Sequence, residues 1–221
     1  MIPYLIASLI IGFLIPYIAR RFAKFMPATF AGAIVELFRL EKKHPLFRKT
    51  TQYHQFIWRS IVSSVILFAT TYLAFNHFDK HGFGFVFSFI SLLILMAEID
   101  YRTFLLPDIL TIPLLLLGII APNFGFGFIS AYESSVGAAV GYFLPVIVSL
   151  LIVWKNKEAF GGGDIKLLSA VGAWLGIEGL LYVIITASIL GLLYALIQKT
   201  KTLAFGPMIA IASIIIAFYL Y

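Results

Sequence analysis

The chain has 221 residues, of which 62% are hydrophobic and 12% are charged, and its mean hydropathy is +1.02. A soluble domain is about half apolar and about a quarter charged, so this composition indicates an integral membrane protein. The sequence contains no cysteine, which excludes disulfides, cysteine-ligated zinc and thiol nucleophiles. The net charge of +6 needs no nucleic acid partner, because basic cytoplasmic loops and contact with the lipid bilayer account for it.

The apolar stretches predict an all-α, polytopic membrane protein with about eight transmembrane helices. A span needs about 17–25 mainly apolar residues. The first stretch has neither a basic start nor a small-residue cleavage site, so we expect a retained span rather than a signal peptide. The sixth is short, and we expect it to form a tight hairpin with the seventh at residues 176–179. The predicted spans are residues 2–18, 56–75, 83–99, 105–122, 130–154, 165–175, 179–197 and 203–220.

The basic residues orient these spans. Every lysine and arginine except Lys80 lies in or beside the connections that follow the first, third, fifth and seventh spans. Because short cytoplasmic loops collect basic residues, we expect these connections in the cytoplasm and both termini outside. We expect one integral membrane domain over residues 1–221, containing a cytoplasmic loop at residues 19–55. In that loop, apolar residues at helical spacing (Phe30, Ile34, Leu37 and Phe38) predict an amphipathic helix on the membrane surface.

Four acidic residues fall at the expected cytoplasmic helix ends, namely Glu98, Asp100, Asp108 and Asp164. Ionisable groups that border the hydrocarbon are candidates for function. Asp100 ends the third span, and Asp164 follows the glycines 161–163 at the start of the sixth, so both are expected at one membrane depth. Each also has an ordinary alternative: Asp100 pairs with Arg102 or Lys166, and Asp164 caps its helix.

Two carboxyl groups at this depth can share one proton. The ionised one then acts as general base on a water molecule, and the protonated one donates to a substrate carbonyl. Gly161, Gly162 and Gly163 let the backbone turn sharply and let an extended substrate approach closely. These residue types predict aspartic protease chemistry at the end of the bundle.

Two segments, IDYRTFLLPDILTIPLLLLG (residues 99–118) and FGGGDIKLLSAVGAWLG (residues 160–176), resemble the type IV prepilin peptidases, which are intramembrane aspartic proteases with a G-x-G-D motif. The resemblance implies that Asp100 and Asp164 are catalytic. By the same resemblance, Lys166 corresponds to a recurrent lysine that positions the substrate or keeps the site ionised. The alternative is that Lys166 contacts a lipid headgroup. Asp108 stands where other members have asparagine, and we expect it to cap its helix. Gly206 and Pro207 resemble a segment near the substrate in related proteases, but we favour a plain helix start.

The resemblance implies a substrate class and a location. The substrates are prepilins or type II secretion pseudopilins, from which a basic leader is cleaved after a glycine at the cytoplasmic face of a bacterial inner membrane. Neither a metal nor a cofactor is expected for the peptidase reaction.

Family members often also methylate the new N-terminus with S-adenosylmethionine. Here Ile15 and Pro16 replace the usual asparagine of that segment, and the cysteine-rich metal-binding loop of many members is missing. The polar candidates of the loop are irregularly spaced, so we interpret them as solvated rather than as metal ligands; they are Glu36, Glu41, His44 and His54. We favour retained methylation, and expect S-adenosylmethionine as a cofactor only in that case.

Two other classes remain open: a proton-coupled transporter, and a non-enzymatic scaffold of a pilus or secretion machine. A transporter favours acids at the membrane midplane and internal repeats, whereas these acids lie at one end and the chain shows no repeat. A scaffold would tolerate the loss of both aspartates.

Spaced glycines also predict how two helices pack. Gly137 and Gly141 in the fifth span, and Gly172 and Gly176 in the sixth, offer smooth faces for close helix contact. The alternative is that glycine is simply common in membrane spans.

Overall fold

The computed structural model describes residues 1–25, 50–78, 80–153, 161–199 and 203–221. All regular structure in these ranges is helical, which confirms the all-α prediction. The expected amphipathic stretch at residues 30–38 lies outside them. The elements are α1 (Ile2–Phe25), α3 (Thr50–His77), α4 (Phe83–Thr103), α5 (Asp108–Ile120), the short 3₁₀ helix η2 (Ala121–Phe124), α6 (Ala131–Val153), α7 (Gly162–Gln198) and α8 (Gly206–Leu220).

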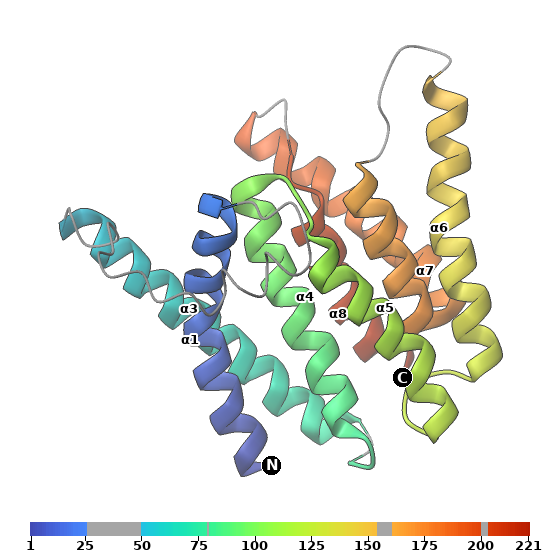
Figure 1. Ribbon diagram of the computed structural model, residues 1–221, viewed down its shortest axis with the longest axis horizontal. Coiled ribbons are helices and arrows are strands. Elements are labelled where there is room, and N and C mark those ends of the chain that lie inside the picture. Colours follow the sequence, from blue (N-terminus) through green and yellow to red (C-terminus); the bar gives the residue numbers. More distant parts are fainter. Residues whose placement is uncertain (26–49, 79, 154–160, 200–202) are drawn as a thin grey trace.

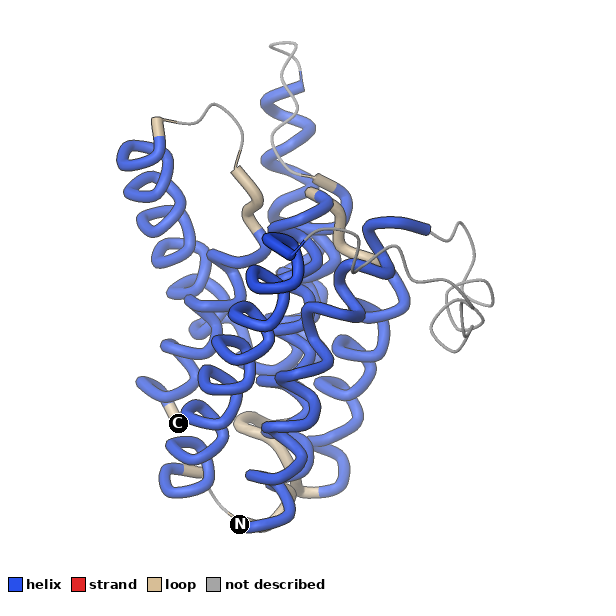
Figure 2. The backbone as a smooth tube through the Cα atoms, turned by 90° about the vertical axis from the view of Figure 1, so that its left-hand side faces the viewer, coloured by secondary structure: helices blue, strands red, loops and turns tan. Residues whose placement is uncertain are grey.

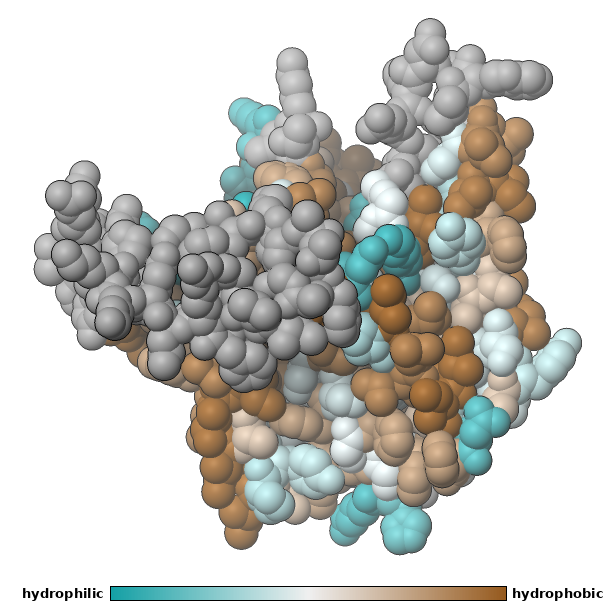
Figure 3. Space-filling model, viewed as in Figure 1, coloured by the Kyte–Doolittle hydropathy of each residue, from teal (hydrophilic) through white to brown (hydrophobic). Residues whose placement is uncertain are grey.

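Five of the described helices, α1, α3, α4, α6 and α7, are long and apolar enough to cross a membrane. The apolar helices α5 and α8 are shorter, with 13 and 15 residues. Hydrophobic side chains cover much of the outer surface (Figure 3), as expected for a surface that faces lipid. The structure is therefore that of a polytopic membrane protein.

α7 contains a break at Gly176, where φ is 65° and ψ is −172°. Only glycine adopts this conformation readily. The two arms of α7 run in opposite directions from this point, so that both ends of α7 lie at the upper end of the bundle in Figure 1. The predicted hairpin is confirmed, although it turns at a single residue. With α7 divided in this way, each predicted span corresponds to one helical segment.

Glycines bring α6 into close contact with the first arm of α7. A Cβ atom on Gly137 would overlap the carbonyl oxygen of Gly172, and one on Gly172 would overlap the carbonyl oxygen of Gly137. One turn further, a Cβ on Gly141 would lie 2.5 Å from the carbonyl oxygen of Leu168. The predicted close contact is confirmed, and it fixes the position of α7 relative to the outermost helix of the bundle.

Aromatic residues tie α7 to α4 and α5. The Trp174 ring centroid lies 4.8 Å from that of Phe89, and the indole Nε1–H donates a 2.8 Å hydrogen bond to the carbonyl oxygen of Leu114. Trp174 is almost fully buried, so its polar group needs this partner. The contact holds the first arm of α7 in the centre of the bundle.

The two ends of the bundle differ in charge. Both termini lie at the lower end of the bundle (Figures 1 and 2). The connection between α3 and α4, which carries Lys80, lies at the same end. The end of α4 and the start of α7, which carry Arg102 and Lys166, lie at the opposite end. For the described residues, the segregation of basic residues predicted from the sequence is confirmed.

Candidate active site

Asp100 lies in the last turn of α4 and is 4% exposed. Its carboxylate accepts a 2.8 Å hydrogen bond from the backbone N–H of Gly206, the first residue of α8. An N–H at a helix N-terminus stabilises a carboxylate both as a donor and through the helix dipole. The contact joins α4 to α8 through the site itself.

Neither of the expected ion-pair partners reaches Asp100. Arg102 donates instead to Glu98, with Nε 2.7 Å from Oε1, and Lys166 binds Asp108. The interpretation of Asp100 as an ordinary ion-pair partner is therefore wrong. Among the described residues its hydrogen-bond donor is a backbone amide, which leaves the carboxylate without a bound cation.

Gly206 is the residue whose role sequence reasoning missed. α8 does begin there, with Pro207 at its second position as expected, but Gly206 also packs on the Asp100 side chain. A Cβ atom at position 206 would lie 2.8 Å from Oδ2 and 3.0 Å from Cβ and Cγ of Asp100. The sequence feature that could have indicated this role is a glycine directly before a proline at a helix start, because the helix itself does not require glycine at that position.

We expect Gly206→Ala to lower leader cleavage by about tenfold or more, because the added methyl must displace Asp100 and overpacking of this kind typically costs about 1–3 kcal/mol. The effect should appear in kcat rather than in KM, measured on the purified protein. Gly84→Ala is the matched control, since its Cβ would meet only the Tyr4 hydroxyl at an ordinary 3.6 Å. Equal activity of the two variants would contradict the assigned role of Gly206.

Asp164 is the third residue of α7, which begins at Gly162 after the extended residue Gly161. The N-cap residue is therefore Gly161 rather than Asp164. The Asp164 carboxyl group lies beside the Gly161 backbone, where a Cβ atom would come within 3.3 Å of Oδ2. A carboxylate in the first turn of a helix is stabilised by the free N–H groups there.

The three glycines before Asp164 have different surroundings. Gly161 and Gly162 are exposed, and a Cβ on Gly162 would meet nothing within 4 Å. Gly163 packs on Leu106, since a Cβ there would lie 2.9 Å from the Leu106 Cβ. Gly163 thus lets α7 approach the segment before α5, while the two preceding glycines present open backbone.

The structure brings Asp100 and Asp164 together at one end of the bundle. They come from α4 and α7, which are far apart in sequence, yet their carboxyl groups are close enough to interact electrostatically. Asp100 is buried and Asp164 is partly exposed. Like charges at close range in unequal surroundings favour a pair that holds one proton.

The other two candidate acids are paired with cations. Lys166 Nζ lies 2.6 Å and 2.8 Å from the two carboxylate oxygens of Asp108, and both side chains are about half exposed (44% and 54%). Asp108 is the first residue of α5 and makes no capping bond, so the capping prediction is wrong. The ion pair links α5 to α7 beside the two aspartates.

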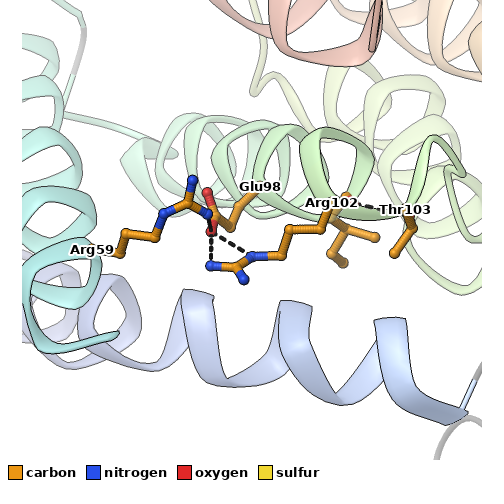
Figure 4. A network of polar contacts seen from close by, with 5 residues as sticks. Arg59, Glu98, Arg102 and Thr103 are labelled. Carbon is orange, nitrogen blue, oxygen red and sulfur yellow. Dashed lines mark hydrogen bonds and ion pairs between the residues drawn. The ribbon is translucent and has the colours of Figure 1, made fainter. Parts of the chain in front are cut away.

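Glu98 is held by two arginines (Figure 4). Its Oε1 lies 3.1 Å from Nη1 of Arg59 on α3, and it also accepts from Arg102 one turn further along α4. The Thr103 hydroxyl caps the same helix end by donating to the carbonyl oxygen of Ile99. The network fixes the C-terminal turn of α4, which carries Asp100.

The family model described as the type IV leader peptidase family matches residues 87–196. A prepilin leader peptidase/N-methyltransferase of Escherichia coli (strain K12) is 34% identical over 210 residues, covering 89% of this chain and 92% of that protein.

Longer relatives match over a shorter part of this chain. A prepilin leader peptidase/N-methyltransferase of Dichelobacter nodosus is 40% identical over 144 residues, which are 63% of this chain and 50% of that protein. One of Xanthomonas campestris pv. campestris is 37% identical over 155 residues, 64% of this chain and 52% of that protein. The matched segment thus spans about half the length of these two relatives. No solved structure matches significantly. The match to nearly the whole E. coli protein, together with the family model, shows that this chain belongs to the type IV leader peptidase family.

Proposed function

We propose that this chain is an aspartic endopeptidase that removes the leader from prepilins or type II secretion pseudopilins by cleaving after a glycine. The observation that carries the proposal is the pair of Asp100 and Asp164, which interact at one end of the bundle with no cation bound to either among the described residues. Family membership and the activity for which the E. coli relative is named support the substrate class.

The surroundings of the two aspartates support a division of roles. The Gly206 N–H donates to Asp100 Oδ2, and a donor of this kind stabilises a carboxylate oxygen as an acceptor. We therefore assign Asp100 as the base that takes a proton from the attacking water. The more exposed Asp164 is the acid that donates to the oxygen of the scissile carbonyl.

The backbone before Asp164 suits an extended substrate. Peptide groups at the membrane border need hydrogen-bond partners from protein, because lipid offers none. Gly161 and Gly162 are exposed and free of side chains that would block such an approach. We assign them to substrate positioning, while Gly163 and Lys166 hold α7 against the start of α5 and so keep Asp164 in place.

We place the site at the cytoplasmic face of a bacterial inner membrane, with both termini outside and residues 19–55 as a cytoplasmic loop of a single domain. The support is the basic end of the bundle, since Arg59, Arg102 and Lys166 lie with the aspartates, and Lys80 and the termini lie opposite. A protease-protection experiment on tagged termini in inner-membrane vesicles tests this orientation.

Cleavage of a prepilin by the purified chain in detergent tests the peptidase function. We expect mass spectrometry to show two products that separate after the glycine at the end of the basic leader. An intact prepilin after incubation with folded, monodisperse protein would contradict the proposal. Proton-driven uptake in proteoliposomes, or pilus assembly by the double Asp100→Asn, Asp164→Asn variant, would support a transporter or a scaffold instead.

We propose N-methylation as a second activity, supported by the three relatives compared above, each of which is named as an N-methyltransferase. Three of the polar loop residues considered above, Glu36, Glu41 and His44, lie outside the described residues. Gly12 lies three residues before Ile15, in the segment (residues 12–21) compared above with the methylation motif. It packs on α3, where its Cβ would lie 2.5 Å from Ser64 Cα. That glycine is therefore explained by helix packing, and the methylation proposal rests on the relatives.

We expect a pilin processed by this chain in the presence of S-adenosylmethionine to carry one methyl group on its new N-terminus. Mass spectrometry of the mature product detects the addition, and the same reaction without the cofactor is the control. An unmodified N-terminus at complete cleavage would leave a dedicated peptidase.

A further inference from the structure

A second polar site lies at the basic end of the bundle, between α1, α3 and the last turn of α4, the helix that also carries Asp100. It is a pocket of about 380 Å³ lined by Arg20 of α1, by Gln55, Trp58 and Arg59 of α3, and by Arg102 of α4. The pocket thus lies where three helices meet, and the peptidase chemistry does not use it.

The charges of the pocket do not balance. In the part of the chain that the structure describes, Glu98 is the acid within range, and it accepts from both Arg59 and Arg102. Arg20 forms no ion pair within the described chain; its guanidinium lies 4.7 Å from the centroid of the Phe56 ring and within electrostatic range of the other two arginines. Among the described residues, three guanidinium groups face one carboxylate, which leaves two positive charges without an acidic partner there; unpaired charge is costly at the membrane border.

We propose that this pocket binds a phosphoryl anion, in the first place the phosphate of an anionic phospholipid headgroup. Guanidinium groups match phosphate oxygens with two parallel hydrogen bonds, and they bind phosphate better than a compact ammonium does. The Glu98 ion pairs already hold two of the three arginines in place, so little side-chain freedom remains to be lost on binding.

The position of the pocket favours a lipid as the source. Its arginines lie near the ends of membrane-spanning helices, at the level where headgroup phosphates lie. Trp58 is 67% exposed beside them, and tryptophan is enriched at this level of membrane proteins. The volume leaves room for the glycerol part of a headgroup beside the phosphate.

The same chemistry disfavours S-adenosylmethionine in this pocket. That cofactor carries a sulfonium and an ammonium cation against one carboxylate, so its net charge is positive. Arg20, Arg59 and Arg102 suit its carboxylate but repel the two cationic groups. The pocket therefore does not fit the cofactor, and we derive no step of methyl transfer from it.

Thermal unfolding of the purified full chain in an uncharged detergent tests the proposal. The probes are dihexanoyl-phosphatidylglycerol, inorganic phosphate, and dihexanoyl-phosphatidylcholine as a lipid of equal chain length without net charge. We expect phosphatidylglycerol to raise the melting temperature up to a plateau as its concentration increases. Phosphatidylcholine should raise the melting temperature much less. Saturation by phosphate alone to the same extent would support the phosphoryl site and identify a soluble source.

Arg20→Gln should weaken the apparent affinity for the anion about tenfold or more, since it removes a charge-assisted pair of hydrogen bonds. Lys199→Gln is the matched control: it removes one exposed positive charge from the same end of the bundle, outside the pocket, and should leave the affinity unchanged. If Arg20→Gln does not fold, Arg20→Lys is used instead. It keeps the charge but cannot form the bidentate hydrogen bonds, and should show a smaller loss of affinity. No stabilisation by either anion, or equal stabilisation of wild type and Arg20 variants, would overturn the proposal.

Discussion

Replacing Asp100 or Asp164 with asparagine is expected to lower the rate of leader cleavage by at least about 100-fold, the usual contribution of a general acid or base. An amide can neither take a proton from water nor donate one as an acid, so each single variant removes one half of the proposed pair. The rates are measured with purified protein and a purified prepilin, under single-turnover conditions so that binding and chemistry are separated.

Asp108→Asn is the matched control, because it makes the same chemical change at the same end of the bundle. Its carboxylate is half exposed and loses only the ion pair with Lys166, which at such a site is worth up to about 1 kcal/mol, or a factor of about five. All three variants should show wild-type far-UV circular dichroism. Either aspartate variant retaining a tenth of the wild-type rate would contradict the assignment of that residue.

Enlarging Gly172 should separate α7 from α6 and displace Asp164 as a consequence. Even a Cβ atom at this position would overlap the carbonyl oxygen of Gly137, a backbone atom that has no other rotamer to adopt. We expect Gly172→Ala to destabilise the protein by about 1–3 kcal/mol, and Gly172→Leu to destabilise it further. Cleavage should fall in the same order, because Asp164, which we propose as the catalytic acid, lies about two turns away on the same arm of α7.

Gly84→Ala serves again as control, since it adds the same methyl group to a helical glycine in ordinary van der Waals surroundings. The melting temperature in detergent and the cleavage rate are measured for each variant. A Gly172→Leu protein with wild-type melting and wild-type cleavage would show that α6 and α7 do not rely on this contact.

Local and periodic features of the sequence were enough to predict the helices and which of their ends lie together. The hydrocarbon thickness sets the length of an apolar run, so the spans follow from counting, and the Gly176 hairpin follows from a glycine between two such runs. Alternation of basic connections placed Asp100 and Asp164 at one end without any knowledge of contacts. The spaced glycines of α6 and α7 likewise indicated a contact, because small residues let helices approach closely in lipid.

The partners of the polar side chains were predicted less well. Glu98, Asp100 and Asp108 all lie near Arg102 or Lys166 in sequence or in membrane depth. The ion pair considered as the alternative for Asp100 does not form, whereas Glu98 and Asp108 bind these cations. Which carboxylate meets which cation depends on the rotation of each helix about its own axis. Hydropathy gives the depth of a residue in the membrane, but in a helix that is apolar on nearly all sides it carries almost no information about rotation.

The sequence by itself determined that this is an all-α membrane protein, that two aspartates share one end of it, and that two of its helices meet through glycines. Only the tertiary structure decided that the amide of Gly206 binds Asp100, that Asp108 holds Lys166, and that three arginines from three helices surround one pocket. The features predicted from the sequence depend on the length of apolar runs, on the spacing of glycines and on the distribution of charge along the chain. The others depend on contacts between helices whose relative rotation is set by the packing of the whole bundle.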